Sequence, residues 1–189
     1  MGFNTRGGEE KSMLNYTTLE CGLLFKENEP YIVDRVVKRG PADHQGIDIR
    51  PGDKLTSING KKLDPNALRD SYFYRPAMET EMILSFKRDG ESFDVNIHPT
   101  SSRVLSGYFY NEWIDQNHDK VKELSDGQIA YAHMKNMGGG ELNNFIMTMT
   151  RELKGKKGLI LDLRYNTGGN VHDDVLRFLQ QKTYLQWKS

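Results

Sequence analysis

The residues with the clearest chemical potential lie near the end of the sequence, where the segment DLRYNT (162–167) runs into Gly168 and Gly169. The apolar run GLIL (158–161) precedes it, and a helical pattern begins at Val171. A buried strand that ends in a glycine pair before a helix leaves backbone N–H groups open, and such groups can hold an anion or a developing oxyanion. The pattern therefore predicts an anion-stabilising turn whose attacking group comes from elsewhere.

The length and charge of the chain limit the kinds of molecule that it is expected to bind. The chain has 189 residues, which fits one or two small domains, and it carries 26 basic and 26 acidic side chains. This balance gives no reason to expect nucleic acid or an acidic membrane surface as a partner. No apolar run approaches the ~18 residues of a membrane span, and the first residues lack the apolar core of a signal peptide. The single cysteine, Cys21, excludes an internal disulfide and is expected to be packed.

The first part of the chain has the pattern of short strands. Residues 1–18 are polar and are predicted to form a loose leader. Alternating apolar residues over 82–87 and 93–97, with the turn residues Asp89 and Gly90 between them, predict a hairpin with one buried face. Short helices are predicted to begin at Pro41 and at Pro65, the second with Asp64 as its N-cap; Asp53 is expected to brace a turn.

The pattern changes after Pro99. Apolar residues at three- and four-residue steps predict a long helix that ends at Ser125-Asp126-Gly127. A strand over 128–134, a helix after the glycines at 138–140, a strand over 158–163 buried on both faces, and a last helix from Val171 follow. This β-α-β-α order predicts two parallel strands joined by a right-handed crossover. Two strands cannot bury both faces alone, so this domain is expected to be incomplete.

Three segments of the first part resemble a PDZ domain of the form attached to bacterial proteases: CGLLF (21–25), RGPADHQGI (39–47) and PGDKLTSING (51–60). The resemblance implies a small β-sandwich with two short helices and a groove for an extended or C-terminal peptide. In this chain the peptide-binding residues would be Gly22, Leu23, Leu24, Phe25, Leu68 and Tyr72. Leu24 stands where the family often has a second glycine, and the alternative is that the Gly22 loop only packs.

Two segments of the second part, GQIAYAHMKNMGGGELNNFI (127–146) and KGLILDLRYNTGGN (157–170), resemble the core of tail-specific and tricorn-type serine peptidases. The resemblance implies hydrolysis of an amide by a serine nucleophile, with two backbone N–H groups holding the oxyanion. Gly168 and Gly169 would supply one of these donors. The family's nucleophilic Ser lies in a later strand-to-helix turn and its base is a His before the PDZ-like domain, or in the other branch a downstream Lys. We therefore expect this chain alone to be inactive.

Other candidate sites are weaker. His133 is expected to be a packed or surface residue, and Asp162 and Arg164 are expected to brace one another or the neighbouring strand ends. The run His172-Asp173-Asp174 lacks a spaced partner for a metal, and the glycines at 138–140 lack the Lys-Ser or Lys-Thr of a phosphate loop. We expect neither a metal nor another cofactor.

Together these patterns predict a mixed α+β chain of four parts: a leader (1–18), a PDZ-like domain (19–99), a connecting helix (100–127) and a partial serine peptidase core (128–189). The expected partners are a peptide or unfolded protein, the rest of the peptidase core and, through a strand edge near Leu159, a second copy. The compartment stays open between bacterial cytoplasm and periplasm. The alternatives are a non-catalytic PDZ-type regulatory module and, less well supported, a small anion- or nucleotide-binding protein.

Overall fold

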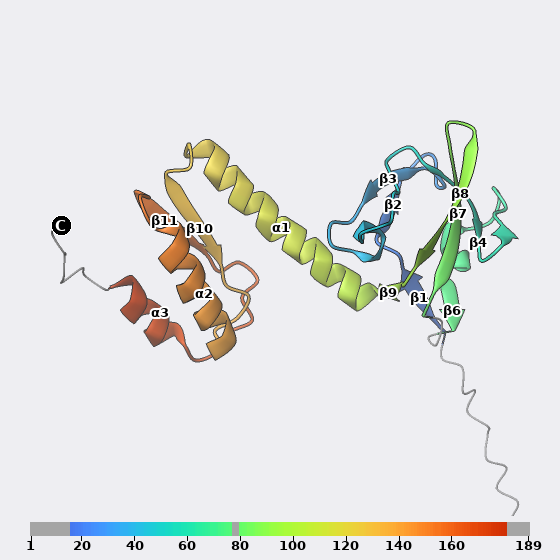
Figure 1. Ribbon diagram of the computed structural model, residues 1–189. Coiled ribbons are helices and arrows are strands. Elements are labelled where there is room, and N and C mark those ends of the chain that lie inside the picture. The colour runs from blue at the N-terminus through green and yellow to red at the C-terminus, as the bar shows by residue number, and fades with distance from the viewer. Residues whose placement is uncertain (1–15, 77–79, 181–189) are drawn as a thin grey trace, which may run out of the picture. The chain divides into compact units, whose positions relative to one another are not determined.

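The computed structural model describes residues 16–76 and 80–180, and it has the mixed α and β content that the sequence predicts (Figure 1). The chain forms two compact units, which meet in sequence between Glu112 and Trp113. This boundary falls inside helix α1 (Ser102–Leu124), so the helix belongs partly to each unit. Each unit is described by itself below.

The first unit consists mainly of short strands: β1 (Tyr16–Glu20), β2 (Leu23–Phe25), β3 (Val33–Val36), β4 (Lys54–Ile58), β5 (Lys61–Lys62), β6 (Tyr74–Pro76), β7 (Met82–Arg88), β8 (Glu91–Ile97) and β9 (Thr100–Ser101). Two one-turn 3-10 helices, η1 (Pro41–Asp43) and η2 (Arg69–Tyr72), interrupt them. The strands form sheets in the orders β5-β4-β7-β8, β6-β1-β9 and β2-β3. Short strands in small sheets with two short helices match the predicted architecture.

The predicted hairpin is confirmed as β7 and β8, which pair antiparallel from Met82 opposite Ile97 to Arg88 opposite Glu91. Asp89 and Gly90 both have positive φ, 51° and 92°, as a two-residue turn between twisted strands requires. Alternate residues of β7 face the core, while Ile83 between them is exposed. The hairpin therefore supplies one wall of the core of the first unit, whose fully buried members include Val33, Leu55, Met82, Leu84 and Phe86.

Asp53 is buried in this unit and braces a turn, as expected. Its carboxylate accepts hydrogen bonds from the Arg50 N–H at 2.7 Å and from the Arg88 guanidinium at 2.7 and 2.8 Å. Burial opposes the charged form, but these bonds outweigh burial and hold the pKa of Asp53 below its ordinary value. The carboxylate thus ties the turn before β4 to the end of β7.

The helix predicted from Pro65 is wrong, because residues 64–67 form a turn instead. The Asp64 side chain accepts the Asn66 N–H at 2.9 Å, and the Asp64 carbonyl accepts the Ala67 N–H at 3.0 Å. The Tyr31 hydroxyl lies 2.8 Å from the Asp64 carbonyl and 3.1 Å from the Ala67 carbonyl. The local bond within Asp64–Asn66 and the long-range bonds from Tyr31 both compete with helix formation, so helical structure is confined to η2.

The second unit contains the end of α1, then β10 (Ile129–His133), α2 (Gly139–Glu152), β11 (Gly158–Asp162) and α3 (His172–Leu179). Helix α1 ends where predicted, with positive φ at Asp126 and Gly127. Strands β10 and β11 pair in parallel, from Ile129 opposite Gly158 to His133 opposite Asp162. The predicted β-α-β-α order is therefore confirmed, with α2 as the crossover.

Helices cover the two faces of this sheet to different extents. Ala132 and Leu161 lie on the face that packs against residues of α2 and α3, including Phe145, Met149 and Val175. Tyr131 and Ile160 lie on the other face, where the second unit's part of α1 contacts Tyr131. Ile160 remains 46% exposed, so the expectation that β11 is buried on both faces is wrong at this residue. Helix α1 covers the β10 side of the face and leaves the β11 side open.

Among the described residues, no helix combines the length and apolar composition needed to cross a bilayer.

Candidate functional sites

The turn after β11 is fixed by the side-chain amide of Asn166. Its Nδ2 donates to the Met134 carbonyl at 2.8 Å, and its Oδ1 accepts the Gly168 N–H at 2.8 Å. Because one planar group makes both bonds, it sets the distance between the turn and the end of β10. The sequence motif includes Asn166, but the sequence did not predict that its side chain would hold the turn.

Backbone bonds fix the same turn from the other side. The Thr167 N–H donates to the Lys135 carbonyl at 3.0 Å, and the Met137 N–H donates to the Gly168 carbonyl at 2.8 Å. Met137 and Gly169 form a parallel bridge, which the Asn170 N–H completes by donating to the Met137 carbonyl at 3.0 Å. The glycine turn is thus a short continuation of the parallel sheet.

The two glycines are not equivalent donors. The Gly168 N–H is already bonded to Asn166, whereas in the described part of the chain the Gly169 N–H has no hydrogen-bond acceptor. The backbone of Gly169 has φ 140°, and a Cβ there would lie 2.3 Å from the Met137 carbonyl oxygen. Only glycine fits this position, and of the two glycines Gly169 is the one whose N–H has no acceptor among the described residues. The two glycines were expected to supply one donor between them, and the bond from Gly168 to Asn166 leaves Gly169 as the candidate.

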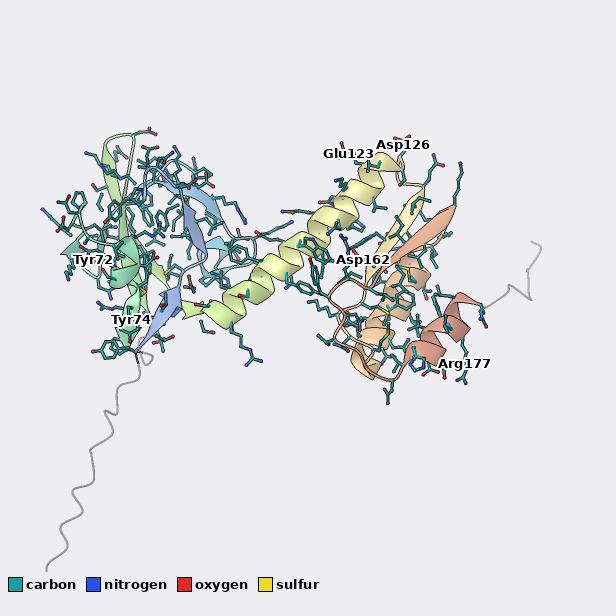
Figure 2. The ribbon with its side chains drawn as sticks, turned by 180° about the vertical axis from the view of Figure 1, so that it is seen from behind. Tyr72, Tyr74, Glu123, Asp126, Asp162 and Arg177 are labelled. Carbon is teal, nitrogen blue, oxygen red and sulfur yellow. The ribbon has the colours of Figure 1, made fainter. Side chains whose placement is uncertain are left out.

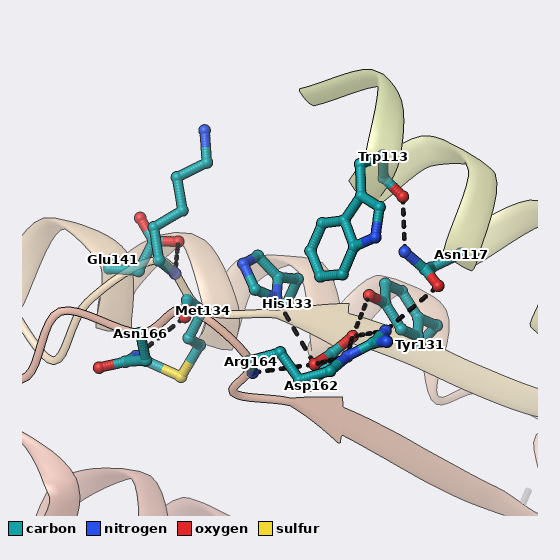
Figure 3. Close-up of polar contacts among 10 residues, drawn as sticks. Trp113, Asn117, Tyr131, His133, Met134, Glu141, Asp162, Arg164 and Asn166 are labelled. Carbon is teal, nitrogen blue, oxygen red and sulfur yellow. Dashed lines mark hydrogen bonds and ion pairs between the residues drawn. The ribbon is translucent and has the colours of Figure 1, made fainter. Parts of the chain in front are cut away.

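Asp162, at the end of β11, is a buried carboxylate surrounded by donors (Figure 3). Arg164 donates to it through Nη2 at 2.5 Å, through Nε at 3.0 Å and through its backbone N–H at 3.0 Å. The Tyr131 hydroxyl donates to it at 2.7 Å. The Arg164 hydrogen bonds hold the pKa of Asp162 well below its ordinary value, and burial raises the pKa of Tyr131. The predicted bracing of Asp162 by Arg164 is confirmed.

Arg164 is in turn held by the second unit's part of α1. Its guanidinium lies 4.7 Å from the centre of the Trp113 ring, and its Nη2 donates to Asn117 Oδ1 at 3.2 Å. Asn117 is oriented by its own bond to the Trp113 carbonyl at 2.6 Å. The side chains that follow β11 are thus anchored to the helix, which places the following glycine turn.

His133 is a packed residue, one of the two alternatives expected. Its side chain is fully buried, its ring meets the Trp113 ring edge-on at 5.3 Å, and its Nδ1 lies 4.0 Å from Asp162 Oδ1 (Figure 3). Burial lowers the pKa of His133, which favours the neutral imidazole. The surroundings indicate a structural side chain.

The predicted peptide-binding strand, β2, has one open edge. In the described part of the chain it pairs with β3 alone. The Gly22 carbonyl accepts the Val37 N–H at 2.8 Å and the Lys26 N–H donates to the Ile32 carbonyl at 3.0 Å, so these groups face β3. Because backbone groups alternate along a strand, those of Leu23 and Phe25 face the open edge. An added peptide strand would pair there.

Two adjacent hollows lie beside this edge and together form what we call the groove. The first, of about 210 Å³, is lined by Leu23, Leu24 and Phe25 of β2, by Arg69 and Asp70 of η2, and by Thr18, Leu19, Glu20, Cys21 and Phe73. The second, of about 650 Å³, shares Phe25, Arg69 and Asp70 and adds Leu68. The structure therefore brings Leu23, Leu24, Phe25 and Leu68 together, as predicted, and places buried Cys21 beside them.

Tyr72 does not line either hollow, contrary to the sequence prediction. Its hydroxyl accepts the Asp64 N–H at 2.9 Å, and its ring packs against the core. The reason is that η2 is a single 3-10 turn and not the expected helix. Arg69 lies at the groove instead, with its guanidinium 4.6 Å from the centre of the Phe25 ring. Figure 2 shows Tyr72 and Tyr74 with the other side chains of this unit.

Comparison with known proteins agrees with both parts of the chain. Residues 127–185 match the family model described as peptidase family S41, and residues 1–67 match the model described as PDZ domain. The second part of the chain is thus similar to peptidase family S41, and the first part to a PDZ domain. The predicted resemblance is thereby confirmed.

Curated relatives of this chain include a putative tricorn protease homolog 2 of Streptomyces coelicolor, which is 32% identical over 147 residues. A probable CtpA-like serine protease of Staphylococcus aureus is 30% identical over 153 residues. The matches cover 75% and 80% of this chain but 12% and 28% of the relatives, so the chain spans well under a third of their length. The crystal structure of the tricorn protease aligns with a TM-score of 0.59 and 23% identity, over 89% of this chain and 16% of that one, and shows the fold.

Proposed function

We propose that this chain contributes a substrate-binding PDZ unit and one oxyanion donor to a serine peptidase that cleaves peptides or protein tails. The observation that carries the peptidase part is the Gly169 N–H, which lacks an acceptor in the described residues, while the N–H groups of Thr167, Gly168 and Asn170 around it are all bonded. The match of residues 127–185 to peptidase family S41 supports the reaction type, hydrolysis of an amide by a serine nucleophile.

The chemistry needs a donor that is already in place when charge develops. Attack of a serine oxygen on a peptide carbonyl carbon moves negative charge to the carbonyl oxygen, and a fixed N–H at that point stabilises the charge without reorganising. The bonds from Asn166 and the bridge to Met137 supply this fixation for Gly169. The second donor and the serine would come from other residues of the peptidase.

Residues 1–189 alone are proposed to cleave nothing. After Gly169 the sequence contains only one serine, Ser189, and the side chain of His133 is fully buried beside Trp113 and Asp162. The test is a peptidase assay with fluorogenic peptides on the purified 189-residue protein, for which we expect no turnover. Turnover that persists through purification and disappears in Gly169→Ala would overturn this part.

The groove is proposed to bind the C-terminal residues of an extended peptide. The support is the open edge of β2 next to a hollow with apolar walls from Leu19, Leu23 and Phe73. An added strand gains backbone hydrogen bonds from the edge and places alternate side chains in the hollow.

Calorimetric titration with one peptide carrying either a free or an amidated C-terminus tests this binding. We expect the free carboxylate to bind more tightly, and Phe25→Ala to weaken binding of both peptides. Ile83→Ala, at an exposed residue outside the groove, is the matched control and should bind as the parent does. Equal affinity of the parent for the two peptides would remove the carboxylate-capture proposal.

The second candidate function is a non-catalytic peptide-binding module, which the same groove favours. The two candidates differ in whether the reading frame supplies a serine at a later strand-to-helix turn, and sequencing the gene beyond codon 189 decides between them.

A second copy of the chain is a further proposed partner, since the open side of β11 could pair with another strand.

A further inference from the structure

Glu112 is a buried charged residue that neither proposed site uses. It lies in the first unit's part of α1 and is 8% exposed. Its Oε1 accepts the Lys38 backbone N–H at 2.6 Å, and both carboxylate oxygens accept from Arg35 Nη1, at 3.1 and 3.0 Å. A buried carboxylate is costly unless it is paired, so this arrangement fixes the position of the segment that follows β3.

That segment, residues 37–41, forms the rear wall of the Gly22 turn. A Cβ placed on Gly22 would lie 3.0 Å from the Pro41 Cδ and 3.5 Å from the Gly40 Cα. The Gly40 N–H closes the segment on itself by donating to the Val37 carbonyl at 2.9 Å. Because the contact is so close, a shift of residues 37–41 would shift the Gly22 turn.

The link to the groove is the peptide group between Gly22 and Leu23. Its carbonyl points to β3, where it accepts the Val37 N–H at 2.8 Å. In a planar trans peptide the N–H points opposite to the carbonyl, so the Leu23 N–H points away from β3 and toward the open edge. Leu23 lines the first hollow, and its N–H is therefore placed to meet a carboxylate there.

We propose that Glu112 is a positioning residue for capture of a C-terminal carboxylate, although it does not touch the peptide. It holds the Lys38 N–H, which fixes the neighbouring Val37 N–H, which in turn aims the Gly22–Leu23 peptide group. The inference rests on the proposed binding of peptides by the groove. It adds to that proposal a residue outside the groove, Glu112, that controls recognition of the terminal carboxylate.

A purely structural role for Glu112 predicts a different result. If the carboxylate only held α1 against the sheet, its loss would weaken the domain as a whole and would affect free and amidated peptides alike. Positioning of the Leu23 N–H predicts a loss confined to the free carboxylate. The ratio of the two dissociation constants therefore separates the two roles.

The experiment uses the 189-residue protein and the matched free-acid and amide peptides. Glu112→Ala removes both interactions, while Glu112→Gln keeps an acceptor for Lys38 and loses the charge that pairs with Arg35. We expect Glu112→Ala to weaken binding of the free-acid peptide by about tenfold and of the amide by less than about twofold. Glu112→Gln should lie between the alanine variant and the parent. The control is Glu123→Gln, the same change at an exposed position of the same helix (Figure 2), which should leave both constants unchanged.

Amide hydrogen exchange without peptide gives a second readout. We expect faster exchange in Glu112→Ala at Lys38, whose N–H loses its acceptor, and at Val37, whose bond to the Gly22 carbonyl is no longer supported by its neighbour. If the alanine variant does not fold, the glutamine variant carries the test through the same ratio.

Two results would overturn the inference, and they differ in what they say about the groove. If the parent protein prefers the free-acid peptide and both Glu112 variants keep the same preference, Glu112 has no positioning role, while carboxylate capture still holds. A parent protein with no preference would remove carboxylate capture and the inference together.

Discussion

At the scale of single residues, the glycine turn depends on groups that cannot be exchanged for their nearest relatives. Asn166 uses its side-chain amide both as donor, to Met134, and as acceptor, from Gly168. An aspartate has the same shape but no donor, so it would face the Met134 carbonyl with an oxygen. Gly169 has no room for a Cβ. The turn therefore requires asparagine at 166 and glycine at 169, which is a stricter requirement than the spacing of the motif indicates.

The two glycines give a first prediction. Gly168→Ala meets no atom within 4 Å and carries only the strain of φ 85°, so it should lower the free energy of unfolding by about 1–2 kcal/mol. Gly169→Ala must also move the Met137 carbonyl and should cost about 3 kcal/mol or more. Urea denaturation of the two variants provides the comparison. Equal losses would contradict the close contact between Gly169 and Met137.

Asp162 gives a second prediction, in the dependence of stability on pH. Its pKa is lower in the folded than in the unfolded state, so it stabilises the fold above its ordinary pKa of about 3.9, and this contribution is lost as pH falls through the lower folded pKa. Asp162→Asn should lower the free energy of unfolding at neutral pH by about 2–3 kcal/mol. The difference from the parent should shrink between about pH 4 and pH 2.

Denaturant titrations at several pH values measure this difference. The control is Asp173→Asn at an exposed position of α3, for which we expect a change within about 0.5 kcal/mol at every pH. A constant difference between parent and Asp162→Asn over the whole range would show that the Asp162 carboxylate gains nothing from its donors.

At the scale of elements, sequence patterns predicted what depends on local chemistry. The β7–β8 hairpin followed from alternation and the Asp89-Gly90 turn, and α2 followed from its apolar face. The helix at Pro65 failed because Tyr31, more than thirty positions earlier in the chain, binds the carbonyls that a helix would use. Such long-range bonds leave no mark in a local pattern. For the same reason Tyr72 was placed at the groove in error and Arg69 was missed.

Tyr31 gives a third prediction. Tyr31→Phe removes the hydroxyl that lies beside the Asp64 and Ala67 carbonyls, and should lower the free energy of unfolding by about 1 kcal/mol. Tyr16→Phe at an exposed position should change it by less than about 0.5 kcal/mol. Amide exchange across η2 should quicken only in the first variant. Unchanged exchange there would mean that the turn is held by its own local bonds.

At the scale of the whole molecule, the sequence indicated two parts, and the structure places a separate core in each unit. One core contains Leu84 and the other contains Met149. The sequence assigned the connecting helix to neither part, whereas the unit boundary lies within it, between Glu112 and Trp113. Glu112 bonds to Lys38 of the first unit and the next residue, Trp113, contacts His133 of the second, and the periodicity of the helix does not predict such contacts.

The separate cores give a fourth prediction. Leu84→Ala and Met149→Ala should each lower stability by about 2–5 kcal/mol, each in its own unit. Hydrogen exchange with peptide-level mass spectrometry should show faster exchange only in the unit that carries the change, and the double variant should show both effects unaltered. A single transition in which either substitution speeds exchange throughout the chain would indicate one cooperative molecule.

The open side of β11 has a practical consequence for anyone who works with the purified protein. Ile160 and Leu163 are 46% and 42% exposed, beside a strand edge that pairs with nothing in residues 16–76 and 80–180. Solutions should therefore turn cloudy as they are concentrated, and a lysine in place of Ile160 should delay this precipitation without disturbing the opposite face of the sheet. The exposed edge of this one strand would then determine how long a concentrated solution can be stored before it precipitates.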